Sequence, residues 1–292
     1  MSKITIIAEI GECFNGDMNT AKEMISIAAK TGCDIAKFQT LDQENISPDD
    51  PEREWFEKIS LNEAQINELL ACGLENNIKV VFTPENVKTA KWLKNAQIDT
   101  IKIASSCADD LDLMQYVNQN FNHIIASTGM ASLDEVNKID QSFDQNKLTI
   151  LHCISEYPTG PLLDERGLKA LDHKDVNMNM MKILQNLFPH RNVGYSDHTV
   201  GILAPVVAAS MGATCIEKHF TLDRKIPVDN FNAGREYLGT DHVLSVEPNE
   251  LKEMVSQIRE VESILGPYIW DRTPGEKILM KFLRDRFKEN EL

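Results

Sequence analysis

Two histidines stand in similar settings twenty-one residues apart, and they are the first candidates for chemistry. His198 lies in Gly-Tyr-Ser-Asp-His-Thr and His219 lies in Ile-Glu-Lys-His-Phe-Thr. Each ends a short apolar segment typical of a buried strand, and a helical stretch separates them. Neighbouring parallel strands lie ~4.8 Å apart, so side chains at their ends can converge on one ion. An isolated histidine near a strand end is more often a hydrogen-bonded core or surface residue, but the pairing favours a shared metal.

Two imidazoles without thiolate partners favour a borderline divalent ion such as Mn²⁺, Co²⁺, Fe²⁺ or Zn²⁺, with water and substrate oxygens completing the shell. An open shell indicates catalysis, because such an ion polarises a carbonyl oxygen. Glu9 and Glu217 are then the candidate acid/base groups. The alternative for both carboxylates is ion pairing to nearby lysines.

A second set of polar residues would suit the oxygens of phosphate and carboxylate groups. Its members are two lysines and five hydroxyl residues at the ends of apolar runs, namely Lys37, Lys102, Thr83, Ser105, Ser127, Ser155 and Ser196. Residues two apart on a strand share a face, so Gln39 points with Lys37. Gly129 follows Ser127 closely, where the backbone can approach a ligand. A solvated rim of serines is the alternative interpretation.

Eight short, β-branched runs must position these side chains. They span residues 4–10, 35–40, 79–83, 100–105, 123–127, 148–155, 192–198 and 213–221. Helical patterns alternate with them at residues 20–31, 61–76, 87–95, 110–118, 132–140, 168–188 and 201–211. This order predicts an α/β fold, a (β/α)₈ TIM barrel. A doubly wound sheet would use the same elements, but the polar residues gather at the carboxyl ends of the strands, where TIM barrels carry their active sites.

The C-terminal quarter departs from the alternation. Residues 224–244 form a long stretch containing glycine and asparagine, which predicts a structureless loop of the kind used as a lid or binding loop. Residues 247–265 carry a helical apolar stripe that would close the barrel wall. We therefore expect a barrel domain at residues 1–268 and a C-terminal helical tail at residues 269–292.

Composition restricts the partners and the compartment. The 292 residues carry a net charge of −15, which argues against nucleic acid or an anionic membrane as a partner. No apolar run approaches the ~18 residues that a membrane span requires. Six cysteines are scattered singly, and Cys33, Cys153 and Cys215 lie in apolar segments. Reduced, buried thiols in a cytoplasmic protein are the expectation.

Several motifs, taken in order along residues 4–265, resemble those of the sialic acid synthase (N-acetylneuraminate synthase) family. They include Ala8-Glu9-Ile10-Gly11, Lys37-Phe38-Gln39-Thr40, Lys102-Ile103-Ala104-Ser105, Ser127-Thr128-Gly129-Met130, Gly194-Tyr195-Ser196-Asp197-His198-Thr199 and Glu217-Lys218-His219-Phe220-Thr221. The resemblance implies an enzyme that condenses phosphoenolpyruvate with an open-chain N-acetylmannosamine-like aldehyde, releases phosphate and leaves a 2-keto-3-deoxy sugar acid. It also implies a homodimer.

The resemblance gives the candidate residues specific roles. His198 and His219 would bind Mn²⁺, with Mg²⁺ or Co²⁺ as alternatives. The seven lysine and hydroxyl residues named above would hold phosphoenolpyruvate. Glu9 and Glu217 would be catalytic, and Gln39, Tyr157, Glu217 and Asp241 would face the sugar.

The chain also departs from the family pattern in the parts expected to read the sugar. Cys13 and Phe14 replace an Asn-His pair, and Ser106 and Cys107 replace a Gly-Glu pair whose glutamate contacts the sugar. A longer segment at residues 227–242 replaces a short Pro-Gly-Pro-Asp-His motif, and the C-terminal antifreeze-like domain of most members is expected to be absent. A different sugar aldehyde, a pyruvate-dependent aldolase and a non-catalytic sugar-binding relative therefore remain as alternatives.

Overall fold

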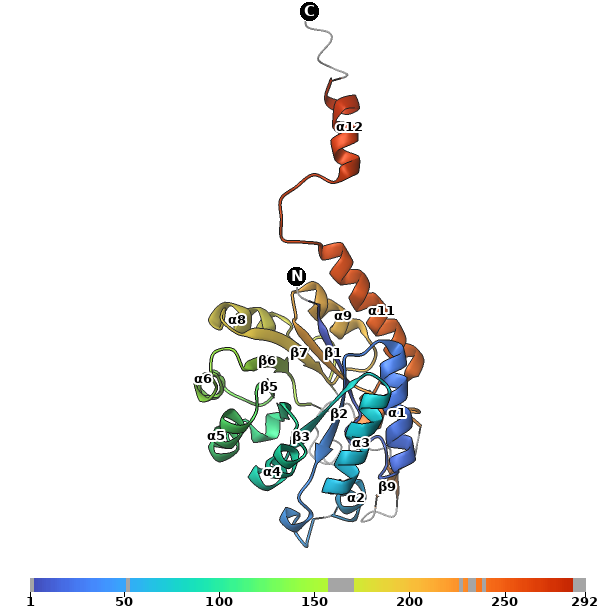
Figure 1. The fold of residues 1–292 in the computed structure, drawn as a ribbon, viewed down its shortest axis with the longest axis vertical. Helices are drawn as coiled ribbons and strands as arrows, with labels where there is room; N and C mark the ends of the chain where they lie inside the picture. The colour runs from blue at the N-terminus through green and yellow to red at the C-terminus, as the bar shows by residue number, and fades with distance from the viewer. Residues whose placement is uncertain are drawn as a thin grey trace, which may run out of the picture.

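Eight parallel strands close into a barrel in the computed structural model, which describes residues 3–50, 53–156, 171–225, 228–230, 235–237 and 240–285 (Figure 1). The strands are β1 (Thr5–Glu9), β2 (Ile35–Thr40), β3 (Lys79–Pro84), β4 (Thr100–Ile103), β5 (His123–Ser127), β6 (Leu148–Cys153), β7 (Asn192–Asp197) and β8 (Cys215–His219). Each strand pairs with the next along the chain, and β8 pairs with β1. The predicted (β/α)₈ barrel is confirmed.

The barrel interior explains why the polar residues gather at one end. A ring of apolar side chains fills it, formed by Ile7, Ile35, Val81, Ile125, Leu151 and Cys215. Two residues further along the same face, five of these strands carry a charged or hydroxyl residue, namely Glu9, Lys37, Thr83, Ser127 and Glu217. Strand alternation therefore places a charged or hydroxyl side chain directly above the apolar ring, at the carboxyl end of the barrel.

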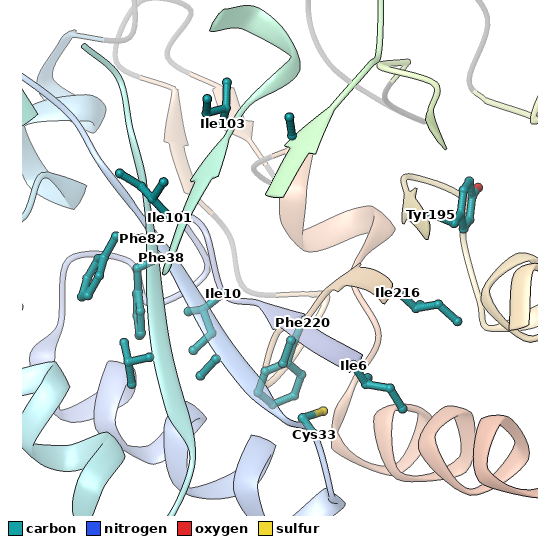
Figure 2. Packing of buried hydrophobic residues seen from close by; sticks show 14 of the residues in the cluster. Ile6, Ile10, Cys33, Phe38, Phe82, Ile101, Ile103, Tyr195, Ile216 and Phe220 are labelled. Carbon is teal, nitrogen blue, oxygen red and sulfur yellow. The ribbon is translucent and has the colours of Figure 1, made fainter. Parts of the chain in front are cut away.

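The opposite face of each strand packs against the surrounding helices. Figure 2 shows Phe38 beside Phe82, with Ile6, Ile216 and Phe220 near the closure of β8 on β1. The Phe38 and Phe82 rings stack with centroids 6.0 Å apart. These outward-facing residues form the larger hydrophobic core, which holds the strands rigidly enough to position their polar ends.

Helices follow the strands along the chain, and all but the last described one lie around the barrel (Figure 1). They are α1 (Met18–Thr31), α2 (Arg53–Ile59), α3 (Glu63–Glu75), α4 (Val87–Asn95), α5 (Leu111–Asn120), α6 (Leu133–Ser142), α8 (Asn179–Leu187), α9 (Leu203–Ser210), α10 (Thr240–Leu244), α11 (Pro248–Leu265) and α12 (Pro274–Asp285). Ser132 and Glu135 form a reciprocal capping box at the start of α6. Helix α11 packs against α1 and α9 and closes the wall, as its apolar stripe predicted (Figure 1).

Two segments differ from the sequence-based expectation. The helix predicted at residues 168–188 begins at Asn179, because turns occupy the preceding described residues and Asn177 has a left-handed φ of 44° that an α-helix cannot accept. The loop at residues 224–244 is not structureless. It contains an antiparallel pair, β9 (Val228–Asn230) with β10 (Arg235–Tyr237), followed by α10.

The chain beyond α11 leaves the barrel. Helix α12 lies away from the strands at the end of an extended segment (Figure 1). Its apolar side chains Ile278, Leu279, Phe282 and Leu283 are exposed. The domain boundary at residue 268 stays a prediction. Within the described part of the chain, no helix has both the length and the apolar character needed to cross a membrane.

Candidate active site

A cavity of about 340 Å³ opens at the carboxyl end of the barrel. Its walls include all seven residues predicted to bind an anion, namely Lys37, Thr83, Lys102, Ser105, Ser127, Ser155 and Ser196. Glu9, Gln39, Glu217, His198 and His219 line the same cavity. The structure thus brings together side chains from every strand, although their roles stay predictions. Tyr157, predicted to face the sugar, lies outside the described residues.

Four buried charged groups form a compact network on the cavity floor. Lys37 Nζ lies 2.7 Å from Glu9 Oε2 and 3.7 Å from Glu217 Oε2, and Lys102 Nζ lies 3.4 Å from Glu217 Oε1. Each side chain is at least 94% buried. The two positive and two negative charges balance, so an arriving anion finds lysines that are already held in place.

The two carboxyl groups of this network have different proton affinities. Burial raises the pKa of Glu9, and the charge of Glu217 adds to this effect against the opposing charge of Lys37. Burial also acts on Glu217, but Lys102 and Lys37 outweigh it and hold the pKa of Glu217 below its usual value. Glu217 therefore stays ionised, while Glu9 is the carboxyl group better suited to exchange a proton. Lys37 stays charged, because its carboxylate partners outweigh burial and raise its pKa.

Hydroxyl groups and one glycine shape the other wall. Ser105 Oγ accepts a hydrogen bond from the Gly129 amide at 3.0 Å. A Cβ atom at Gly129 would lie 2.0 Å from Ser155 Oγ and 2.7 Å from Ser105 Oγ, so the two serines can approach each other only across a glycine. Ser127 Oγ is buried without a hydrogen-bond partner among the described residues. An unpaired buried hydroxyl facing a cavity is suited to donate to a ligand oxygen.

The two histidines lie side by side at the carboxyl ends of β7 and β8. Their ring centroids are 5.3 Å apart. Nδ1 of His198 lies 2.8 Å from the Ile154 carbonyl oxygen, a contact that orients this ring. Nδ1 of His219 is buried, has no hydrogen-bond partner in the described part of the chain, and lies 3.6 Å from an Asp241 carboxylate oxygen.

The electrostatics of the two imidazoles differ. Burial and the neighbouring His198 lower the pKa of His219 well below its usual value, which keeps that imidazole neutral. Burial also lowers the pKa of His198, but the adjacent Cys153 and the Ile154 carbonyl outweigh it and raise the pKa to about 9. His219, a neutral buried imidazole whose Nδ1 has no hydrogen-bond partner among the described residues, fits a metal ligand. No group of three or more His, Cys, Asp or Glu side chains among the described residues is arranged to hold a metal ion.

A glycine also lets Asp241 reach the site. Gly11 has a φ of +51°, and a Cβ atom there would lie 2.9 Å from Asp241 Oδ2, 3.2 Å from Glu9 Oε1 and 3.6 Å from Gln39 Nε2. Three predicted site residues, Asp241, Glu9 and Gln39, therefore come together beside Gly11, where a side chain would not fit. Burial, together with Glu12 and Glu9, raises the pKa of Asp241 well above its usual value.

Comparison with known proteins identifies the family of this barrel. The NeuB family profile matches residues 24–269. The chain belongs to the NeuB family. An uncharacterized protein of Methanocaldococcus jannaschii is 38% identical over 96% of this chain and 75% of the relative. An N,N'-diacetyllegionaminic acid synthase of Campylobacter jejuni is 31% identical over 97% of this chain and 84% of the relative.

A solved structure has a similar fold. An N-acetylneuraminic acid synthetase of Leptospira borgpetersenii, crystallised with citrate, matches with a TM-score of 0.84 and 27% identity over 98% of this chain and 93% of the other. The resemblance to the sialic acid synthase family is therefore confirmed for this NeuB-family chain.

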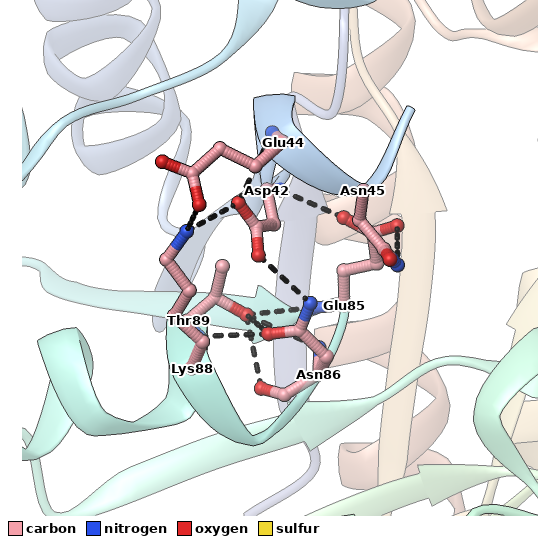
Figure 3. Close-up of polar contacts among 7 residues, drawn as sticks. All are labelled: Asp42, Glu44, Asn45, Glu85, Asn86, Lys88 and Thr89. Carbon is pink, nitrogen blue, oxygen red and sulfur yellow. Dashed lines mark hydrogen bonds and ion pairs between the residues drawn. The ribbon is translucent and has the colours of Figure 1, made fainter. Parts of the chain in front are cut away.

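One side of the cavity mouth is fixed by an ion-pair network that sequence reasoning missed. Figure 3 shows Lys88 bridging two acidic side chains, with its Nζ 2.9 Å from Asp42 Oδ1 and 2.7 Å from Glu44 Oε2. Glu85 accepts a hydrogen bond from the Asp42 amide at 2.7 Å. These contacts tie the segment after β2 to the start of α4, next to the cavity-lining Leu41 and Glu85.

Two of the departures from the family pattern, at Cys13-Phe14 and at Cys107, have different locations. Cys13 and Phe14 are buried in the core and do not line the cavity. Cys107 does line it, together with Leu41 and Met130. Burial raises the pKa of the Cys107 thiol, which makes it a poor nucleophile at neutral pH. The expectation that the Cys13 position bears on sugar choice stays a prediction, whereas Cys107 stands where it can contact a ligand.

Proposed function

We propose that the chain is a phosphoenolpyruvate-dependent synthase that condenses this three-carbon donor with an open-chain sugar aldehyde and releases phosphate. One observation carries the proposal. The lysines, hydroxyls, carboxyls and imidazoles that such a reaction needs all line a single cavity in a chain of the NeuB family.

Donor binding is assigned to the floor and one wall of the cavity. Lys37 and Lys102 supply the positive charge that phosphate and carboxylate oxygens need. The hydroxyls of Thr83, Ser105, Ser127, Ser155 and Ser196 surround the same space. Thr83 already accepts a hydrogen bond from Lys37 Nζ at 3.0 Å, and Ser196 donates one to Glu217 at 2.8 Å. These contacts position the donor site before the ligand arrives.

His198 and His219 would hold a divalent ion, with Mn²⁺ expected and Mg²⁺ or Co²⁺ as alternatives. Two observations support this assignment: Nδ1 of His219 makes no hydrogen bond to any described residue, and the two rings lie close together. When bound, such an ion would polarise the aldehyde oxygen of the acceptor. Gln39 and Asp241 lie beside Glu9 and would orient the acceptor near its carbonyl group.

The proposed reaction forms a bond between C3 of the donor and the aldehyde carbon. Water then adds to C2, phosphate leaves with its electron pair, and a 2-keto-3-deoxy acid remains. Glu9 is assigned the proton transfers of the water step, because burial keeps its proton affinity high beside an ionised Glu217. Glu217 is assigned to holding the lysines and the hydroxyl of Ser196 in place.

The acceptor is proposed as an N-acetylmannosamine-like aldose or another sugar aldehyde. Relatives carry the names N,N'-diacetyllegionaminic acid synthase, N-acetylneuraminate-9-phosphate synthase and pseudaminic acid synthase, so the family includes proteins named for different acids. The apolar Leu41, Cys107 and Met130 at the cavity wall favour an acceptor with an apolar substituent over one that is hydroxylated throughout.

The test is a screen for phosphate release. Purified protein is incubated with phosphoenolpyruvate, Mn²⁺ and a panel of open-chain hexosamines and pentoses, with His219→Ala as the control. Phosphate should appear only with metal, an aldehyde and the unmutated protein. A pyruvate-dependent aldolase would instead consume pyruvate and release no phosphate. Turnover at the normal rate after metal removal would refute the assignment of the histidines.

A further inference from the structure

A buried ion pair lies directly behind the two histidines. Asp197 and Lys218 are register partners on β7 and β8, and each immediately precedes one histidine in the sequence. Lys218 Nζ lies 2.7 Å from Asp197 Oδ2, and both side chains are fully buried. Because alternate residues of a strand face opposite sides, the pair lies outside the barrel wall, whereas the imidazoles lie inside it.

The pair also binds the residue that follows His198. Asp197 accepts hydrogen bonds from the Thr199 amide at 3.1 Å and from the Thr199 hydroxyl at 3.0 Å. Lys218 Nζ donates to the Thr199 carbonyl oxygen. Tyr195, two residues before Asp197, donates its hydroxyl to Asp197 at 2.6 Å. His198 lies beyond the last residue of β7, where the hydrogen bonds between strands end. The bonds to Thr199 therefore hold the backbone on either side of His198 in their place.

Stability alone does not account for this arrangement. Taking two charges out of water is costly, and replacing a buried ion pair by well-packed apolar residues is often neutral or stabilising. An apolar pair would hold β7 against β8 equally well. It would not hold the amide, hydroxyl and carbonyl of Thr199, which are the groups that fix where His198 points.

We propose that the Asp197–Lys218 ion pair is a positioning device that sets the placement of His198 relative to His219. The inference rests on the proposed function, because it takes the two histidines as metal ligands. The pair fixes β7 to β8 at the residue before each imidazole and closes a turn around His198. The Ile154 carbonyl orients the ring itself. Residues that position metal ligands in this way alter affinity about 10- to 100-fold when they are removed.

The test measures metal binding without substrate or turnover. The double variant Asp197→Asn with Lys218→Met removes both charges together, which avoids leaving one of them buried alone. Its Mn²⁺ affinity is measured from the electron paramagnetic resonance signal of unbound Mn²⁺, and its Tm by thermal unfolding. We expect a Kd about 10- to 100-fold weaker than that of the unmutated protein with a Tm within a few degrees of it.

A matched control lies at the opposite end of the same strand. Arg191, directly before β7, binds Asp140 at 2.7 Å, and its guanidinium is almost fully buried. The variant Arg191→Met with Asp140→Asn should lower the Tm and leave the Mn²⁺ Kd unchanged. An unchanged Kd in the Asp197/Lys218 variant would overturn the inference while leaving the proposed function standing. Absence of Mn²⁺, Mg²⁺ and Co²⁺ binding by the unmutated protein would overturn both.

Two less disruptive variants test the positioning role if the double variant does not fold. Thr199→Val removes the hydroxyl bond to Asp197 at nearly constant volume, and Thr199→Ser keeps it. Thr199→Val should weaken Mn²⁺ binding several-fold, and Thr199→Ser should bind as the unmutated protein does. Equal affinity of both variants and the unmutated protein would contradict the positioning role.

Discussion

Replacing Glu9 with glutamine should separate donor binding from turnover. The change is nearly isosteric, and it removes one of the two carboxylates around Lys37. Lys37 keeps Glu217 at 3.7 Å and the Thr83 hydroxyl at 3.0 Å, so its charge stays paired. The net charge of the four-group network changes from zero to +1, which favours an anionic donor.

The expected magnitudes follow from these contacts. Loss of a proton-transferring carboxyl group lowers kcat about 10²- to 10⁴-fold. Loss of one charged hydrogen bond costs about 2 kcal/mol of folding free energy, which lowers the Tm by about 4–8 °C. The Kd for phosphoenolpyruvate should stay the same or decrease, because the lysine is retained and a competing negative charge is gone.

Titration calorimetry with phosphoenolpyruvate and a continuous phosphate assay measure the two effects separately. Glu262→Gln is the matched control, because Glu262 pairs with Arg259 outside the cavity lining. That control should lose some stability and keep its kcat. The assignment of Glu9 would be refuted by a Glu9→Gln enzyme that turns over within tenfold of the unmutated rate. A Kd for phosphoenolpyruvate weakened a hundredfold would refute the electrostatic reasoning.

Three further predictions concern other parts of the site. Lys102→Met should weaken phosphoenolpyruvate binding about 10- to 100-fold by calorimetry, since a charged hydrogen bond contributes about 1.5–3 kcal/mol, and an unchanged Kd would remove Lys102 from the donor site. Gly129→Ala should weaken donor binding at least tenfold by forcing Ser105 and Ser155 apart, with Gly275→Ala, an exposed glycine of α12, as the neutral control in the same titration. Chelation of divalent ions should abolish phosphate release and added Mn²⁺ should restore it, whereas full activity in excess chelator would contradict the metal assignment.

Much of the fold was predictable, because strand periodicity and site chemistry coincide in a parallel barrel. Each apolar residue of the interior ring is followed two positions later by a residue that reaches the cavity, as in Ile7 and Glu9 or Ile35 and Lys37. The sequence therefore shows this pattern directly: along each strand, inward-facing residues recur at every second position, and the last of them is usually polar. The closeness of His198 and His219 follows from the pairing of β7 with β8.

The remaining features depend on contacts between distant segments. The start of α8 at Asn179 is set by a left-handed residue, which an apolar helical pattern does not reveal. The need for glycine at position 129 arises because Ser105 and Ser155 come from different strand ends. The sequence shows Cys13 only as a residue near a motif, whereas its burial in the core depends on the packing of distant segments.

The central claim is that the protein condenses phosphoenolpyruvate with a sugar aldehyde within one cavity. The most direct test supplies phosphoenolpyruvate labelled with ¹³C at C3, Mn²⁺ and the aldehyde selected by the screen, and follows the reaction by nuclear magnetic resonance. We predict that the label moves into the CH₂ group of a 3-deoxy-2-keto acid, in an amount equal to the phosphate released. Labelled pyruvate accompanying the phosphate, or no phosphate from folded, metal-loaded protein, would contradict the claim.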